Sequence, residues 1–233
     1  MLYAKKIKPH MTWKPSSTNK SAVEQLTDRV DELRSALRLL NPELIAARSG
    51  ASYFEADSVR GELHILLWDS ACILSLPELK VRANNDSELP MFQQALLFYY
   101  LLTSDGASLT GSWTSFGDLP GGRTYNQAFQ GYTGNEISKV FGLNLEAFKS
   151  ACEKAGGQFV ALGDAAYRFQ ILPRVPVLAV YHLGDEDFSS TCKILFDSSA
   201  THYVPIDACA VMGSMLAQKI IKTTTLHIIQ SKS

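Results

Sequence analysis

The stretch 111–123 carries the residue types that best suit ligand binding. Its glycines allow the backbone to approach a ligand closely, Trp113 and Phe116 offer flat apolar surfaces, and Arg123 supplies a positive charge. A helix that begins just after this stretch would add free N–H groups, which favour an anion such as a carboxylate or phosphate. The Lys-Ser/Thr ending of a phosphate-binding P-loop is missing. Two interpretations stay open: a ligand site, or a tight loop in which Gly and Pro satisfy the backbone geometry.

Two histidines are candidate ligands for a metal. His182 ends a predicted strand and is followed by Asp185, Glu186 and Asp187, and three carboxylates suit a hard cation. His202 stands just before the last predicted helix, where it could bind a metal axially. The alternatives are a polar hairpin loop around the acids and a surface histidine at a helix entry. We favour these alternatives and assign no metal ligands.

The cysteines and the missing catalytic motifs argue against an enzyme. Cys72, Cys152, Cys192 and Cys209 are far apart and form no Cys-x-x-Cys pair, which makes a zinc ribbon or a self-contained iron–sulfur site improbable. We expect buried free thiols in a reducing cytoplasm. Neither a Gly-x-Ser-x-Gly elbow nor a His-Glu-x-x-His motif is present. A non-catalytic protein is therefore favoured. The alternative is an enzyme that uses Cys152, Cys192 or a metal-bound water.

Composition limits the classes of partner. Hydrophobic residues make up 46% and charged residues 19% of the 233 residues, which is typical of a globular protein and not of a disordered chain. The 22 basic and 23 acidic residues nearly cancel, so there is no global field to attract nucleic acid or an anionic membrane. The longest apolar run, 95–102, is shorter than the roughly 20 residues of a membrane span. The basic N-terminus lacks the apolar segment of a signal peptide. We expect a cytoplasmic protein with a small-molecule ligand and no nucleic-acid or membrane partner.

An amphipathic helix is predicted over residues 22–46, after a basic tail over residues 1–20. Ser21 and Glu24 have the spacing of a capping box. The apolar stripe consists of Val23, Leu26, Val30, Leu33, Leu37, Leu40 and Leu44. We expect the stripe to pack against its own domain. A homodimer through the 23–44 helix is the alternative, with the protein acting in assembly.

The rest of the chain predicts an α+β fold, with antiparallel strand meanders and packed helices. Strands are expected over 53–55, 62–68, 71–81, 158–162, 165–172, 175–182 and 191–196. A helix is expected over 91–103, followed by a short helix that ends near residue 142 and another over 144–155. The last helix is expected to begin near Pro205. No linker divides the chain, so residues 21–233 are predicted to form a single domain. The repeated order of strands and then helices leaves two related halves as an alternative.

Several motifs together resemble a known family. They are the run 111–122 with Tyr125 and Phe129, the run 172–177, the turn 184–188, and the run 194–200 with Tyr203. Over roughly residues 50–222 the chain is similar to the family called domain of unknown function 3786. The resemblance implies a protein of anaerobic bacteria or archaea, several of which are rich in corrinoid enzymes. Some relatives are fused to a cysteine-rich iron–sulfur module that this chain lacks, so we expect no cluster. The family has no agreed catalytic residues.

The anaerobic setting that the resemblance implies leads us to expect a corrinoid (cobalamin) or a related tetrapyrrole as ligand. Such a ligand needs a broad apolar cleft with aromatic walls and hydrogen-bond donors. The candidate site residues are Trp113, Phe116, Arg123, Tyr125 and Phe129, with His182 or His202 as the axial ligand. The Asp-x-His-x-x-Gly motif of the usual corrinoid-binding fold is absent from the sequence. Binding would therefore use another fold.

Overall fold

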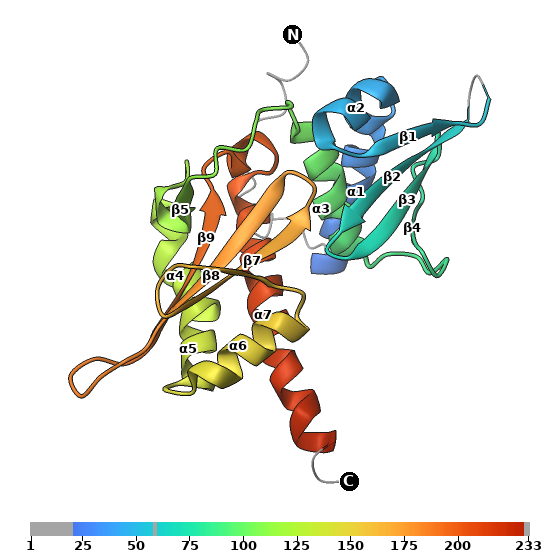
Figure 1. Ribbon diagram of the computed structural model, residues 1–233. Coiled ribbons are helices and arrows are strands. Elements are labelled where there is room, and N and C mark those ends of the chain that lie inside the picture. The colour runs from blue at the N-terminus through green and yellow to red at the C-terminus, as the bar shows by residue number, and fades with distance from the viewer. Residues whose placement is uncertain (1–20, 58–59, 231–233) are drawn as a thin grey trace. The chain divides into compact units, whose positions relative to one another are not determined.

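The computed structural model describes residues 21–57 and 60–230. The predicted basic tail, 1–20, lies outside this range. The chain forms two compact units, each of which is built from separate segments of the sequence (Figure 1). Among the described residues, unit 1 comprises 21–57, 60–108, Leu172–Arg174 and Ser199–Ala208, and unit 2 comprises Leu109–Ile171, Val175–Ser198 and 209–230.

Unit 1 combines helices with a four-stranded antiparallel meander of order β1-β2-β3-β4. Its main elements are α1 (Ala22–Leu37), α2 (Pro42–Ser49), β1 (Ser52–Glu55), β2 (Gly61–Leu67), β3 (Ser70–Leu76), β4 (Val81–Ala83) and α3 (Met91–Thr103). Alternation along β2 buries Leu63, Ile65 and Leu67 on the inner face of the sheet. α3 is apolar on nearly all sides and is buried, as its sequence predicts.

The predicted helix over residues 22–46 is wrong in one respect, because it is two helices. The capping box at its start is confirmed: the Glu24 N–H donates to Ser21 Oγ at 3.2 Å, and the Ser21 N–H donates to the Glu24 carboxylate at 2.7 Å. α1 ends at Leu37, and α2 begins at Pro42 with Asn41 as its cap. Proline has no N–H and its ring clashes with the preceding turn, so it starts a helix more readily than it continues one.

The apolar stripe of α1 is buried inside unit 1. Val30, Leu33 and Leu37 are only 1%, 2% and 3% exposed. α1 packs on α3, where the Arg29 guanidinium lies 5.2 Å from the centre of the Tyr99 ring. The middle of the stripe therefore has the intramolecular role that we expected. A homodimer through this helix stays a prediction, with only the ends of the stripe exposed.

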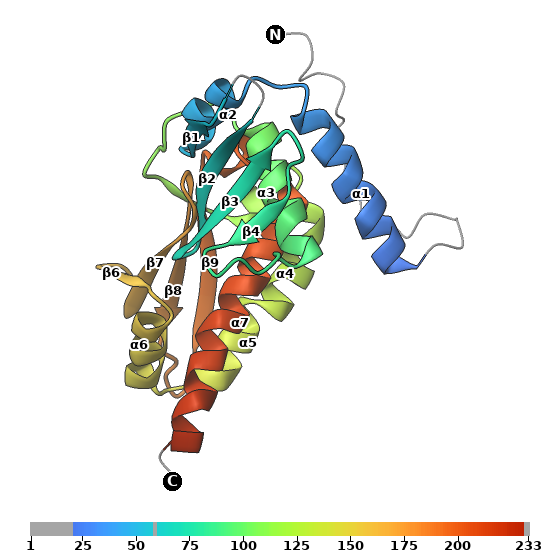
Figure 2. The same ribbon diagram turned by 90° about the vertical axis from the view of Figure 1, so that its right-hand side faces the viewer.

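Unit 2 is built on a five-stranded sheet of order β5-β9-β8-β7-β6. Its elements are β5 (Trp113–Ser115), the short 3₁₀ turns η1 (Phe116–Asp118) and η2 (Arg123–Tyr125), α4 (Asn126–Tyr132), α5 (Gly134–Phe141), α6 (Leu145–Lys154), β6 (Gln158–Val160), β7 (Ala165–Leu172), β8 (Val175–His182) and β9 (Thr191–Asp197). η3 (Ala200–His202) falls in unit 1, where α7 (Ile206–Gln230) also begins before it continues into unit 2. In Figure 2, α4, α5 and α7 lie along one side of strands β8 and β9.

Glycines allow the helices of unit 2 to approach closely. A Cβ atom at Gly134, the first residue of α5, would lie 2.0 Å from the Cys192 carbonyl oxygen on β9. A Cβ atom at Gly213 on α7 would lie 2.5 Å from the Phe129 ring. Helices and two antiparallel sheets make this an α+β protein, so the predicted fold class is confirmed.

Candidate functional site

The aromatic residues predicted as ligand walls differ in their surroundings. Phe116 and Phe129 are 1% and 0% exposed, and their rings stack with centres 4.1 Å apart. They pack in the core of unit 2 and present no exposed face to a ligand. Trp113 is partly buried against a cluster that includes Leu178. Tyr125 is 47% exposed.

The glycines of the 111–123 stretch support the interpretation of this stretch as a tight structural loop. A Cβ atom at Gly122 would lie 1.8 Å from the Phe116 carbonyl oxygen, so only glycine fits there. Gly111 has a φ of +70°, a region that favours glycine. Arg123 lies exposed in η2, beside Tyr125. Among the aromatic candidates the structure thus brings together only Phe116 and Phe129, and it does so as core residues.

A buried carboxylate holds the start of this stretch to β9. Asp197 is 1% exposed and accepts hydrogen bonds from the Thr110 N–H at 3.1 Å, the Thr110 hydroxyl at 2.9 Å and the Gly111 N–H at 2.8 Å. The Ser198 N–H donates to the Ser112 carbonyl at 2.9 Å. Sequence reasoning missed this role, because the two segments lie more than 80 positions apart in the sequence.

The two candidate histidines belong to different units. His182 ends β8 in unit 2 and is exposed. His202 lies in unit 1, where its Nδ1 is 2.7 Å from the Asp105 carboxylate and both side chains are about half exposed. Partial burial opposes ionisation of Asp105, but the hydrogen bonds with His202 and the Ala107 N–H together outweigh it and lower the pKa of that carboxyl. No group of three or more His, Cys, Asp or Glu within residues 21–57 and 60–230 is placed to hold a metal ion.

Three of the four thiols are poor nucleophiles in this structure. All four cysteines are buried, and none of them forms a disulfide bond. Burial raises the pKa of Cys72, Cys152 and Cys192. A raised pKa keeps the thiol protonated at neutral pH, whereas catalysis uses the thiolate. These three cysteines therefore give no support to the enzyme alternative.

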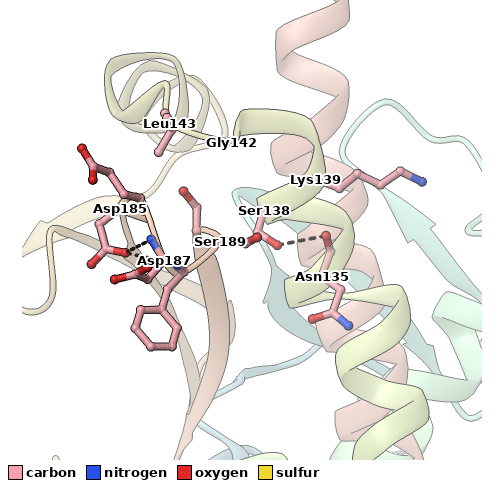
Figure 3. Close-up of a pocket in the computed structure, with 11 residues that line it drawn as sticks. Asn135, Ser138, Lys139, Gly142, Leu143, Asp185, Asp187 and Ser189 are labelled. Atoms are coloured by element: carbon pink, nitrogen blue, oxygen red, sulfur yellow. Dashed lines mark hydrogen bonds between the residues drawn. The ribbon is translucent and has the colours of Figure 1, made fainter.

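An open polar pocket in unit 2 is the best candidate for a ligand site (Figure 3). Its volume is about 490 Å³, within the usual range of small-molecule sites. One wall is the loop between β8 and β9, and the other is α5 with the connection to α6. The lining residues are Asn135, Ser138, Lys139, Gly142, Leu143, Asp185, Glu186, Asp187, Phe188, Ser189 and Ser190.

The loop wall is ordered by its own hydrogen bonds. Asp185 Oδ1 accepts from the N–H groups of Asp187 at 2.9 Å and Phe188 at 2.8 Å. The Gly184 N–H donates to Ser190 Oγ at 2.9 Å. A Cβ atom at Gly184 would lie 2.3 Å from the Phe188 carbonyl oxygen, so the turn needs glycine. The acidic loop therefore has a defined shape, as predicted for a polar hairpin loop.

The helical wall is fixed to the sheet by a buried tyrosine. Gly142 ends α5 with a φ of +52°. Its carbonyl accepts a hydrogen bond of 2.7 Å from the hydroxyl of Tyr181 on β8, a side chain that is fully buried. This bond sets the position of the next residue, Leu143, whose side chain points toward the loop in Figure 3.

The charge around the pocket is negative. Within the described residues, the carboxylates of Glu186 and Asp187 have no hydrogen-bond or ion-pair partner. Figure 3 shows the Lys139 side chain extending away from the loop. Leu143 and Phe188 are 72% and 74% exposed and form an apolar part of the rim. The pocket therefore offers negative charge beside apolar surface.

Sequence reasoning identified only half of this site. The acidic loop was noted as a candidate metal site, but no signal linked it to Asn135, Ser138 and Leu143. Those residues lie more than 40 positions earlier, and only the packing of α5 beside β9 brings them to the loop.

The fold and site define an α+β protein with an open acidic pocket in its second unit. The chain belongs to the family described as Domain of unknown function (DUF3786), whose model matches residues 41–219. The resemblance predicted from the sequence motifs is therefore confirmed. No curated protein and no solved structure matches the chain. No helix of the described residues is both long and apolar enough to cross a bilayer.

Proposed function

We propose that this protein is a non-catalytic binding protein and that the unit 2 pocket receives a small organic cation with an apolar part. The observation that carries the proposal is the cavity of about 490 Å³, with the carboxylates of Glu186 and Asp187 at its rim. An ammonium or guanidinium group would pair with these carboxylates. The attached hydrocarbon would lie against Leu143 and Phe188.

The arrangement of the acids favours an organic cation over a metal ion. Metal ions require several oxygen ligands converging on one point. Asp185 Oδ1 already accepts two backbone N–H groups, and no metal-binding group of three side chains is present in the described part of the chain. Separate carboxylates around an open pocket instead suit a larger cation, which can reach more than one of them.

Calorimetry with purified protein tests this proposal. We expect saturable binding of phenethylamine, arginine methyl ester or spermidine at low ionic strength, and no binding of phenylacetate, which has a similar shape to phenethylamine but the opposite charge. The double variant Glu186→Gln, Asp187→Asn should weaken binding roughly 30-fold, since each of the two exposed charge pairs contributes on the order of 1 kcal/mol and about 1.4 kcal/mol corresponds to a factor of ten.

A matched control is Glu43→Gln, which removes an exposed carboxylate on α2 in unit 1. This variant should bind the amines as the unchanged protein does. Binding of phenylacetate as strong as that of phenethylamine, or an unaltered affinity in the double variant, would contradict the proposal.

A second proposal is that the protein binds a corrinoid or a related tetrapyrrole. Trp113, Arg123 and Tyr125 keep exposed surface, whereas Phe116 and Phe129 are core residues. An anaerobic absorbance titration with cobalamin, and with heme for comparison, tests it directly. A saturable spectral change that Trp113→Ala weakens at least tenfold would support a tetrapyrrole site at the 111–123 stretch. Unchanged spectra with both ligands would discard it.

A cytoplasmic location in an anaerobe also remains a proposal. The four cysteines form no disulfide bonds, which supports a reducing compartment, where disulfides rarely form.

A further inference from the structure

We infer that unit 1 has a ligand site of its own, a small cavity that takes a neutral aromatic ring bearing one hydroxyl group, as in a simple phenol. The cavity lies between the helices α1 and α2 on one side and the strands β1 and β3 on the other. Its volume is about 230 Å³. The inference concerns unit 1 and does not depend on the unit 2 pocket.

The walls of the cavity are mostly apolar side chains. Leu37 at the end of α1, Ile45 on α2 and Leu79 in the turn between β3 and β4 all line it and are buried. Leu40, between the two helices, lines it and is 39% exposed, so it lies at the rim. Such walls favour a ligand that removes apolar surface from water. A closed apolar cavity of about 150 Å³ holds one benzene molecule, so the volume here accommodates a ring with a small substituent.

A tyrosine hydroxyl is available to a ligand in this cavity. Tyr53 on β1 lines the cavity, and its hydroxyl makes no hydrogen bond within the described residues. The ring lies against Gly61 on β2, where an added Cβ atom would be 2.6 Å from Tyr53 Cε2 and 2.8 Å from the hydroxyl oxygen. Leu76, which pairs with Gly61 in the sheet, also lines the cavity. A phenolic hydroxyl both donates and accepts, so a hydroxyl group on the ligand can pair with Tyr53 in either direction.

The charges around the cavity favour a neutral ligand. Among the described residues that line it, only Arg38 carries a charge. Arg38 donates from Nε to the Pro77 carbonyl and from Nη2 to the Glu78 carbonyl, both at 3.1 Å. Because these nitrogens are occupied, Arg38 is poorly placed to hold a carboxylate through two parallel N–H groups. An ammonium ion would meet no carboxylate among the same lining residues.

Methyl NMR of the full chain, titrated with p-cresol, tests the inference. The methyl resonances of Leu37, Ile45 and Leu79 should shift saturably, with a dissociation constant on the order of 1 mM for so small a ligand. Toluene, which lacks the hydroxyl group, should shift the same resonances. p-Toluate, which carries a carboxylate in place of the hydroxyl, should bind more weakly than p-cresol.

Matched variants test the hydroxyl contact and the location of the site. Tyr53→Phe removes only the hydroxyl, so it should weaken p-cresol binding about fivefold and leave the affinity for toluene unchanged. Leu40→Trp fills the rim and should weaken the binding of both ligands about tenfold. Leu39→Trp is the control, because this neighbouring position is 74% exposed and does not line the cavity. It should leave both affinities unaltered.

Several results would overturn the inference. They are methyl resonances that do not respond to p-cresol at about 10 mM, an unchanged affinity for p-cresol in either Tyr53→Phe or Leu40→Trp, and tighter binding of p-toluate than of p-cresol. Shifts of the same resonances on dilution without ligand would assign the cavity to a second copy of the chain, which also overturns it. Circular dichroism of each variant checks that it is folded.

Discussion

Individual polar residues in this protein hold together segments that are distant in sequence. Asp197 connects β9 to the start of the 111–123 stretch. Tyr100 does the same in unit 1, where its hydroxyl donates to the Ser49 carbonyl at 2.5 Å and accepts from the Arg174 N–H at 3.0 Å. Such buried groups are costly to leave unpaired, so each connection fixes a loop more firmly than a surface contact would.

Removing the Asp197 carboxylate should destabilise the fold. Asp197→Ala leaves two backbone N–H groups and one hydroxyl without their acceptor, and we expect a loss of about 3 kcal/mol in the free energy of unfolding. Thr110→Val removes the hydroxyl that donates to Asp197 and accepts from the Ser112 N–H, and it should cost about 1 to 2 kcal/mol. Urea denaturation measures both values. A cost below about 1 kcal/mol for Asp197→Ala would show that water replaces the carboxylate.

Tyr167 gives the fold a dependence on alkaline pH. Burial, followed by a hydrogen bond of 3.0 Å to the Glu153 carboxylate, raises the pKa of Tyr167 to about 12. The pKa of an unfolded tyrosine is about 10. Because the folded state holds its proton more tightly, this contribution to stability is complete below pH about 10 and is lost as the pH rises through about 12.

Tyr167→Phe should therefore be destabilising at pH 9 and less so at pH 11. At pH 9 we expect a loss of about 1 kcal/mol from the missing hydrogen bond. Absorbance at 295 nm should show one fewer late-titrating tyrosine. Glu153→Gln keeps an acceptor but removes the negative charge, so it should lower the pKa of Tyr167. An unchanged alkaline titration in Tyr167→Phe would contradict this assignment.

At the scale of elements, close contacts between backbones decide how unit 2 packs. α5 begins at Gly134 directly against the Cys192 carbonyl of β9, and α7 passes the Phe129 ring at Gly213. The same α5 then supplies one wall of the pocket. The shape of the candidate site thus depends on a residue that does not line it.

Gly134→Ala should destabilise unit 2 and alter the pocket. Its Cβ would overlap the Cys192 carbonyl, and relieving that overlap requires α5 to move, at a cost of about 2 kcal/mol or more. Gly131→Ala on α4 is the matched control, because nothing lies within 4 Å of its added Cβ. Better helix propensity should make that variant neutral or up to about 1 kcal/mol more stable. Thermal unfolding compares the two, and equal stability would refute the predicted overlap.

Most elements could be predicted from the sequence, because their signals are local. The predicted bounds of α3, β7 and β8 are confirmed, since apolar runs with turn residues at both ends depend only on neighbouring residues. The prediction of one helix over 22–46 was wrong at Pro42, where a second helix begins. Proline is a local signal for a helix start, but the apolar stripe continues past it and favoured a single helix. The candidate site was harder to predict, because its two walls share no sequence pattern.

At the scale of the whole molecule, each unit is built from three separate segments of the chain. The turn Leu172–Arg174 belongs to unit 1, whereas the strands on either side of it belong largely to unit 2. The sequence contains no linker, and we therefore predicted a single domain over 21–233. Two compact units can form without a linker when each is assembled from separate segments.

The sequence by itself determined the α+β class, the order and position of most elements, and the family. These features follow from local periodicity, capping and turn chemistry, which a short window of residues contains. Only the tertiary structure decided that Phe116 and Phe129 are core residues, that Leu66 is exposed, and that α5 faces the acidic loop. Each of these depends on contacts between residues far apart in the chain, and such contacts leave no periodic signal in one sequence.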